Sequence, residues 1–205
     1  MTRAAALGLR AVRGGGVAVG VVLDGGEPRV VLSAFLATAA EGDRLAFEPY
    51  HVAFEMAEGA RSASPEVAAA VAEGRRRQAL AAAAGLADLV RRLAGGGSRP
   101  AAAALLVNRA GWVADLLQHV LCDPAHPPFA EGMAVRDALR AAIAGCGLGL
   151  VELDEKSLPE SAAIKLGLTD GELEAKLKAL GAGLKPWRQE HRLACLAAWV
   201  AAAAI

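Results

Sequence analysis

The sequence predicts an α/β protein whose sheet begins with three antiparallel strands. Segments rich in valine and leucine come first, at residues 5–12, 17–23 and 29–36. The breaks between them are Gly14-Gly15-Gly16 and Asp24-Gly25-Gly26, and glycine breaks between apolar runs are typical of β-hairpins. Later apolar runs alternate with stretches of helical periodicity, which indicates an α/β arrangement.

The later elements follow in the order helix, strand, helix, strand, helix. Ser64-Pro65-Glu66 has the residue types of a helix start, which predicts a long helix over 65–94. Short apolar runs predict a fourth strand at 102–107 and a fifth at 148–153. Further helices are expected at about 112–121, 131–144, 170–180 and from Pro186 to about 204, and residues 37–60 are expected to be irregular.

Composition indicates one domain, residues 1–205, with a meander and loop over 1–60 and alternating helices and strands over 61–205. The 22 basic and 22 acidic residues give zero net charge, which argues against avid nonspecific nucleic-acid binding. The three cysteines lack metal-ligand spacing. With no signal-peptide pattern and no apolar run of membrane-spanning length, we expect a cytoplasmic protein without a membrane partner.

The first hairpin, with its triplet Leu7-Gly8-Leu9 followed by Arg10, resembles that of ribonuclease H-like nucleases, especially RuvC-type Holliday-junction resolvases. The order of elements is also that of the ribonuclease H-like fold, a five-stranded mixed sheet with helices on both faces. The resemblance implies four carboxylates that hold two Mg²⁺ ions. The family places one on the first strand, one at the end of the fourth strand, and two on the final helix.

None of the matching positions in this chain holds a carboxylate. The first-strand position is Arg10, which cannot bind Mg²⁺, and the fourth-strand position is Asn108, whose amide oxygen carries no charge. The final-helix positions are His191, which can ligate Mn²⁺, and Ala194, which offers no ligand. The departure puts the family's activity in doubt.

Other polar residues lie near the ends of predicted elements and form a second candidate site. Glu131, Glu155, Glu190 and His191 are catalytic candidates if they converge on a metal or ligand, because ligands of α/β sheets bind at strand ends. The alternative is structural. Glu131 and Glu190 then act as acids at helix starts, and Glu155 forms a surface ion pair with Lys156.

Two further patterns bear on partners and relatives. Arg75, Arg76 and Arg91 on the long helix are candidates for binding a phosphate backbone, with a solvated helix face as the alternative. The chain also resembles a group of bacterial proteins of unassigned activity, through Pro49-Tyr50-His51, Ala130-Glu131-Gly132, Glu155-Lys156 and Pro186-Trp187. His51 beside Tyr50 is either a general base or a structural residue.

Two functions remain open from the sequence. The first is a binding or assembly module on a ribonuclease H-like scaffold that lacks the two-metal centre, with a homodimer as one possible assembly. The second is a metal-dependent nuclease that uses displaced acids and requires Mg²⁺ or Mn²⁺. Nucleic acid is a possible partner in either case.

Overall fold

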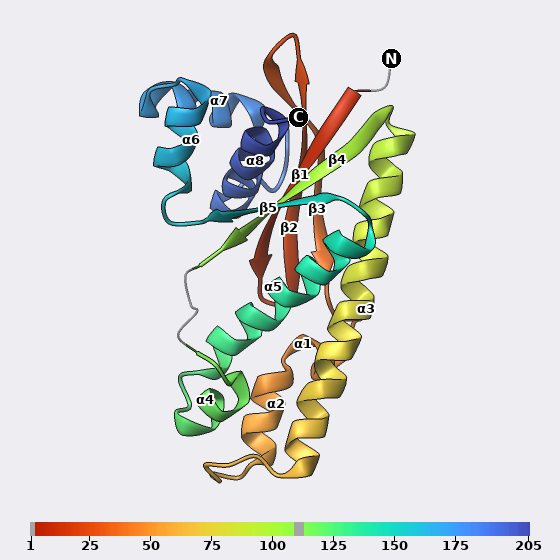
Figure 1. The fold of residues 1–205 in the computed structure, drawn as a ribbon, viewed down its shortest axis with the longest axis vertical. Helices are drawn as coiled ribbons and strands as arrows, with labels where there is room; N and C mark the ends of the chain where they lie inside the picture. The colour runs from red at the N-terminus through yellow and green to blue at the C-terminus, as the bar shows by residue number, and fades with distance from the viewer. Residues whose placement is uncertain (1–2, 109–112) are drawn as a thin grey trace.

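A single five-stranded sheet forms the centre of the computed structural model, which describes residues 3–108 and 113–205 (Figure 1). The strands are β1 (Arg3–Val12), β2 (Gly15–Asp24), β3 (Glu27–Ala37), β4 (Ser98–Val107) and β5 (Gly149–Asp154), in the order β3-β2-β1-β4-β5. β2 is antiparallel to both β1 and β3, whereas β1, β4 and β5 are parallel. The mixed sheet with three antiparallel strands first is therefore confirmed.

Helices cover both faces of this sheet, as predicted (Figure 1). The helices are α1 (Arg44–Phe47), α2 (Pro49–Met56), α3 (Pro65–Gly95), α4 (Leu116–Cys122), α5 (Pro127–Gly145), α6 (Leu158–Leu166), α7 (Asp170–Leu180) and α8 (Gln189–Ala202). α3 and α5 bury one face through leucines and alanines. α6, α7 and α8 bury the other face, so each face has its own apolar core.

A close contact between helix and sheet lies at Gly8, in the middle of β1. A Cβ atom at this position would lie 1.8 Å from the Ala194 carbonyl oxygen and 2.7 Å from the Ala198 nitrogen. Only glycine lets the backbone of α8 approach β1 so closely. Ten of the residues of α8 are buried, which its small alanine side chains permit.

The long helix α3 is continuous through Gly74 and ends one residue beyond the predicted limit. A Cβ atom at Gly74 would lie 2.4 Å from the Leu45 carbonyl oxygen, so the glycine is explained by the close packing of α1. Ser64 caps α3 by accepting a hydrogen bond from the Val67 N–H. The predicted start of this helix is therefore correct.

Several predicted boundaries differ from the structure, and each difference has a local cause. β4 begins at Ser98 because Pro100 is accommodated where the register of β1 and β4 shifts between Ala5 and Ala6. α5 begins at Pro127, so Glu131 is its fifth residue rather than its first. The last helix begins at Gln189 instead of Pro186. The helix predicted at 112–121 begins at Leu116, and Trp112 lies outside the described residues.

Three helices were missed, and the expectation of an irregular segment over residues 37–60 was wrong. α1 and α2 lie within that segment, and α6 follows β5. α6 has Pro159 in its first turn and Gly167 in a left-handed conformation at its end, both of which are helix-boundary signals. Among the described residues, no helix is long and apolar enough to cross a membrane.

Candidate functional site

The parallel strands β1, β4 and β5 end side by side, which defines the candidate site. Leu9 pairs with Leu105 and Leu105 with Glu152, so the three carboxyl ends meet at one end of the sheet. The Glu155 N–H donates to the Val107 carbonyl oxygen at 2.9 Å, which fixes the residue after β5 beside the end of β4. Ligands of open α/β sheets bind at such ends.

An ion pair between Arg10 and Glu155 joins the first and last of these strands. Both Nε and one terminal nitrogen of Arg10 donate to Glu155 Oε1, at 3.1 and 2.7 Å. The two side chains are only 23% and 19% exposed, so the pair is partly shielded from water. Glu155 thus binds Arg10, and the expected surface pair with Lys156 is replaced by a contact between distant strands.

A second guanidinium, Arg136 of α5, lies beside this ion pair. Burial lowers the pKa of Arg136, the charge of Glu155 opposes the shift, and the charge of Arg10 adds to it. The Nε atom of Arg136 is buried without a hydrogen-bond partner among the described residues. Arginine stays protonated even so. Sequence reasoning missed Arg136 because nothing in a helical arginine signals that a strand end lies opposite.

This arrangement does not fit a two-metal centre. Arg10 and Arg136 place two positive charges beside Glu155, whereas Mg²⁺ and Mn²⁺ are held by oxygen-rich sites of net negative charge. Within residues 3–108 and 113–205, no three histidine, cysteine or acidic side chains are grouped so that they could hold a metal ion. The side chains at the sheet end therefore form an ion pair and do not provide the ligands of a metal centre.

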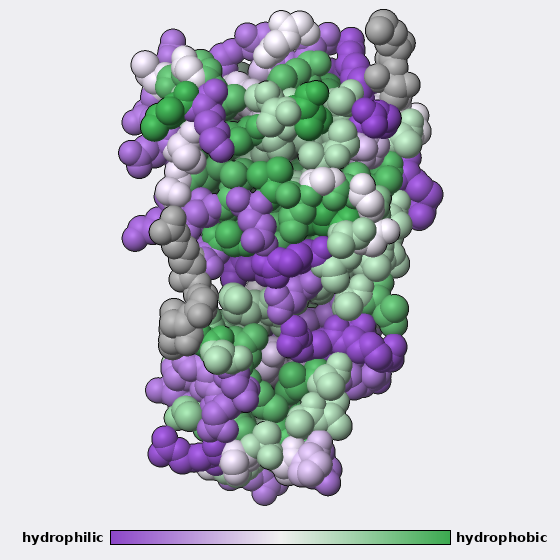
Figure 2. Space-filling view, in the orientation of Figure 1, coloured by the Kyte–Doolittle hydropathy of each residue, from purple (hydrophilic) through white to green (hydrophobic). Residues whose placement is uncertain are grey.

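Ion pairs extend from the sheet end across α5 to α3. Arg140 binds Glu152 of β5 at 2.6 Å and Asp137 at 2.7 Å. Asp137 also accepts from Arg75 of α3 at 2.8 Å. Figure 2 shows hydrophilic residues gathered in a band across the middle of this face. Opposite charges thus alternate along the series, which leaves little unpaired positive charge.

The start of α8 holds the other two candidate residues, Glu190 and His191. His191 is buried; its Nδ1 accepts from the Arg188 N–H at 3.4 Å, and its ring centre lies 6.1 Å from that of Trp187. Burial lowers the pKa of His191, and Glu190 opposes that shift. Ala194 is fully buried against β1, so that final-helix position has no room for a metal ligand.

Glu131 binds the start of α2 instead of the sheet end. Its Oε1 accepts from the backbone N–H groups of Tyr50 and His51 at 2.7 and 3.0 Å, and His51 Nδ1 lies 3.4 Å away. Burial raises the pKa of Glu131, and these hydrogen bonds oppose the shift. Its Oε2 is buried without a described partner. Glu131 therefore caps α2, a helix without a side-chain cap of its own.

The four catalytic candidates consequently have different neighbours. Glu155 is bound to Arg10 and Glu131 to α2, and only Glu190 and His191 influence each other. The other predicted arginines bind acids on their own helix, Arg76 with Glu73 at 2.7 Å and Arg91 with Asp88 at 3.2 Å. Their role in binding nucleic acid stays a prediction.

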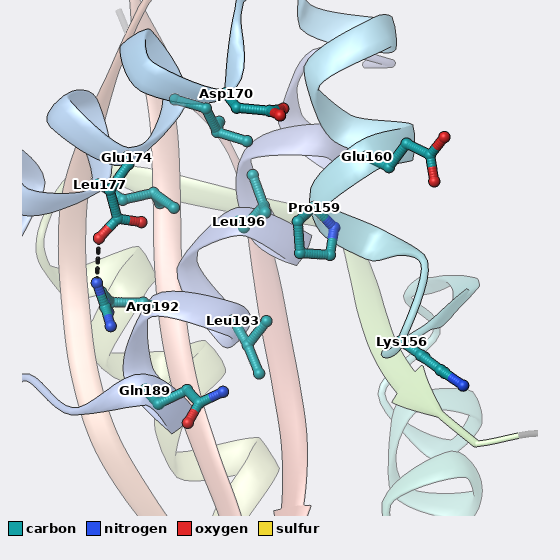
Figure 3. Close-up of a pocket in the computed structure, with 11 residues that line it drawn as sticks. Lys156, Pro159, Glu160, Asp170, Glu174, Leu177, Gln189, Arg192, Leu193 and Leu196 are labelled. Carbon is teal, nitrogen blue, oxygen red and sulfur yellow. Dashed lines mark hydrogen bonds and ion pairs between the residues drawn. The ribbon is translucent and has the colours of Figure 1, made fainter.

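A cavity of about 740 Å³ lies between α6, α7 and α8 (Figure 3). Leucines such as Leu193 and Leu196 line it, and Arg192 and Glu174 form an ion pair at its rim. Lys156 and Glu160 also line a neighbouring cavity of about 780 Å³ that reaches Asn108. In Figure 3 the charged groups of Lys156 and Glu160 point outward. The charged groups of Lys156 and Glu160 thus do not point into the cavity between α6, α7 and α8.

Comparison with known proteins supports the fold. No protein-family model matches the sequence, and no curated protein matches it significantly. The structure of Thermus thermophilus RuvC is similar, with a TM-score of 0.56, 11% identity, and 97% of this chain and 93% of that chain covered. T. thermophilus RuvC in complex with a Holliday junction substrate gives a TM-score of 0.54 and 11% identity over 98% and 93%. The chain therefore has the ribonuclease H-like fold found in RuvC.

Proposed function

We propose that this chain is an assembly module on a ribonuclease H-like scaffold and does not cleave nucleic acid. The observation that carries the proposal is the Arg10–Glu155 ion pair with half-buried Arg136 beside it. Two permanent cations at the sheet end repel the divalent ions on which two-metal cleavage depends. Of the carboxylates there, Glu155 is bound to a guanidinium, and Asp154 accepts hydrogen bonds from the N–H and the hydroxyl of Ser157.

The charge distribution favours a protein partner over nucleic acid. A RuvC of similar fold binds a Holliday junction, which supports nucleic acid as a possible partner. Here, however, Arg75, Arg76 and Arg91 are each paired with an acid, and the chain has no net charge. An arginine that is already paired with an acid contributes less to displacing counterions from a phosphate backbone, which is the main source of affinity for nucleic acid. A second copy of the chain is the protein partner that we favour.

A cleavage assay tests the absence of nuclease activity. Purified protein is incubated with single-stranded, duplex and four-way-junction DNA in the presence of Mg²⁺ or Mn²⁺, beside Glu155→Gln and a Glu131→Ala, Glu190→Ala double variant. We expect no metal-dependent cutting by any of the proteins. Cutting by the unmodified chain that either variant abolishes would overturn the proposal, because displaced acids would then perform the chemistry.

A further inference from the structure

The edge strand β3 begins with Glu27, Pro28 and Arg29 and has a bulge between Val30 and Leu32, and the uncharged, partly apolar stretch that follows lacks charges and prolines. β3 has one neighbour in the sheet, β2, and residues 30–40 contain no charged side chain (Figure 1). Natural edge strands are usually blunted by charges, prolines or a covering element. The start of β3 conforms, because it carries Pro28 and Glu27, which binds Lys176, and the opposite edge, β5, carries Glu152 in an ion pair with Arg140.

Exposed aromatic side chains lie beside this edge. Phe35 on β3 is 57% exposed and Phe47 of α1 is 36% exposed, although the chain has only four phenylalanines. The two rings line a shallow hollow of about 390 Å³, together with alanines that follow β3 and with the charged residues Glu41, Asp43 and Arg44. The exposed ring of Phe35 gives this edge apolar surface that a partner can bury.

The backbone groups that face outward from β3 follow from its pairing with β2. The Thr38 N–H donates to the Gly14 carbonyl oxygen at 2.9 Å. Because hydrogen-bonded positions alternate along an antiparallel strand, Leu36 and Ala34 also turn their backbone groups toward β2. Ser33, Phe35 and Ala37 therefore turn their N–H and C=O groups away from β2. The carbonyl oxygen of Ala37 lies near Gly85 of α3, and the groups of Ser33 and Phe35 are the ones proposed to pair with another strand.

The charges that flank the uncharged stretch indicate which strand pairs there. Arg29 precedes it and Glu41 follows it, and both are exposed with no ion pair among the described residues. Phe35 is midway between them in the sequence. In an antiparallel pair of two β3 strands centred on Phe35, Arg29 of each copy would lie on the same side as the turn that holds Glu41 in the other copy, four residues beyond the end of β3. A parallel pair would instead bring like charges together.

We propose that two copies of this chain pair through β3 in antiparallel orientation about a twofold axis at Phe35. The two sheets then join into one continuous sheet of ten strands. Phe35 packs against its symmetry mate, and the hollow beside Phe47 closes against the partner. This surface deepens the assembly role proposed above and rests on it.

Sedimentation velocity over a range of protein concentrations tests the proposal, beginning with the unmodified chain. We expect a dimer that dissociates on dilution. Phe35→Glu should raise the dissociation constant of the dimer more than tenfold, because it places two like charges at the twofold axis. Ser33→Pro should weaken it as well, because it removes an outward N–H without touching the β2–β3 ladder. Ile164→Glu on α6, at a side chain 77% exposed, is the matched control and should leave the dimer unchanged.

A charge exchange tests the orientation of the pair. Arg29→Glu alone should weaken the dimer, and Arg29→Glu combined with Glu41→Arg should restore it. A monomer at all concentrations, or a dimer insensitive to both edge variants, would overturn the proposal. Failure of the double variant to restore a dimer weakened by Arg29→Glu would overturn the twofold axis at Phe35. Far-UV circular dichroism separates these outcomes from unfolding, and the cleavage assay reports independently on the proposed function.

Discussion

Glu155 and Glu131 are both shielded carboxylates, but they differ in what balances their charge. Glu155 lies at the sheet end and binds the guanidinium of Arg10, with Arg136 nearby. Glu131 has a side chain only 5% exposed and binds two backbone N–H groups at the start of α2. The charge of Glu155 is therefore balanced by guanidinium groups, and Glu131 stabilises a helix. An acid that lies near a functional position can thus have a purely structural role.

The largest effect is expected when the helix-capping glutamate is removed. Glu131→Ala leaves the N–H groups of Tyr50 and His51 without an acceptor in a buried setting, and we expect a loss of about 2–3 kcal/mol in the free energy of unfolding. Urea denaturation measures it. Glu190→Ala, in the first turn of α8, is the matched control and should cost about 0.5 kcal/mol or less. Equal losses in the two variants would contradict the capping role.

The sheet-end ion pair should respond unequally to removal of its two members. Glu155→Gln leaves the like charges of Arg10 and Arg136 without Glu155 between them. We expect it to lower the free energy of unfolding by about 1–2 kcal/mol. Arg10→Met leaves Glu155 beside Arg136, so the expected loss is smaller, about 0.5–1 kcal/mol. A larger loss for Arg10→Met would show that Arg136 does not balance Glu155. Urea denaturation of both single variants and of the double variant measures the coupling.

Much of this sheet could be predicted from the sequence, because strand patterns and turn glycines are local signals. The strands of the first hairpins and the capped start of α3 are of this kind. The candidate site was harder to predict from the sequence. The Arg10–Glu155 contact joins residues 145 positions apart, and the cap of α2 comes from α5. Contacts of that range depend on how the elements pack, which periodicity and propensity do not encode.

The burial of Glu131 also predicts a pH dependence. Because the pKa of Glu131 is raised from its ordinary 4.5, the folded protein holds this proton more tightly than the unfolded chain does. Its contribution to stability is therefore greatest below pH 4.5 and falls as the pH rises through the folded pKa. The stability difference between the unmodified chain and Glu131→Gln should shrink over that window. A difference that grows with pH would contradict the raised pKa.

The central claim is that the sheet end holds an ion pair in place of a metal centre. Isothermal titration of Mn²⁺ into the unmodified chain and into Glu155→Gln tests it most directly. We predict no saturable binding in either protein, because Arg10 and Arg136 oppose a divalent cation. Stoichiometric binding to the unmodified chain that Glu155→Gln abolishes would contradict the account, since Glu155 would then be a metal ligand and not the partner of an arginine.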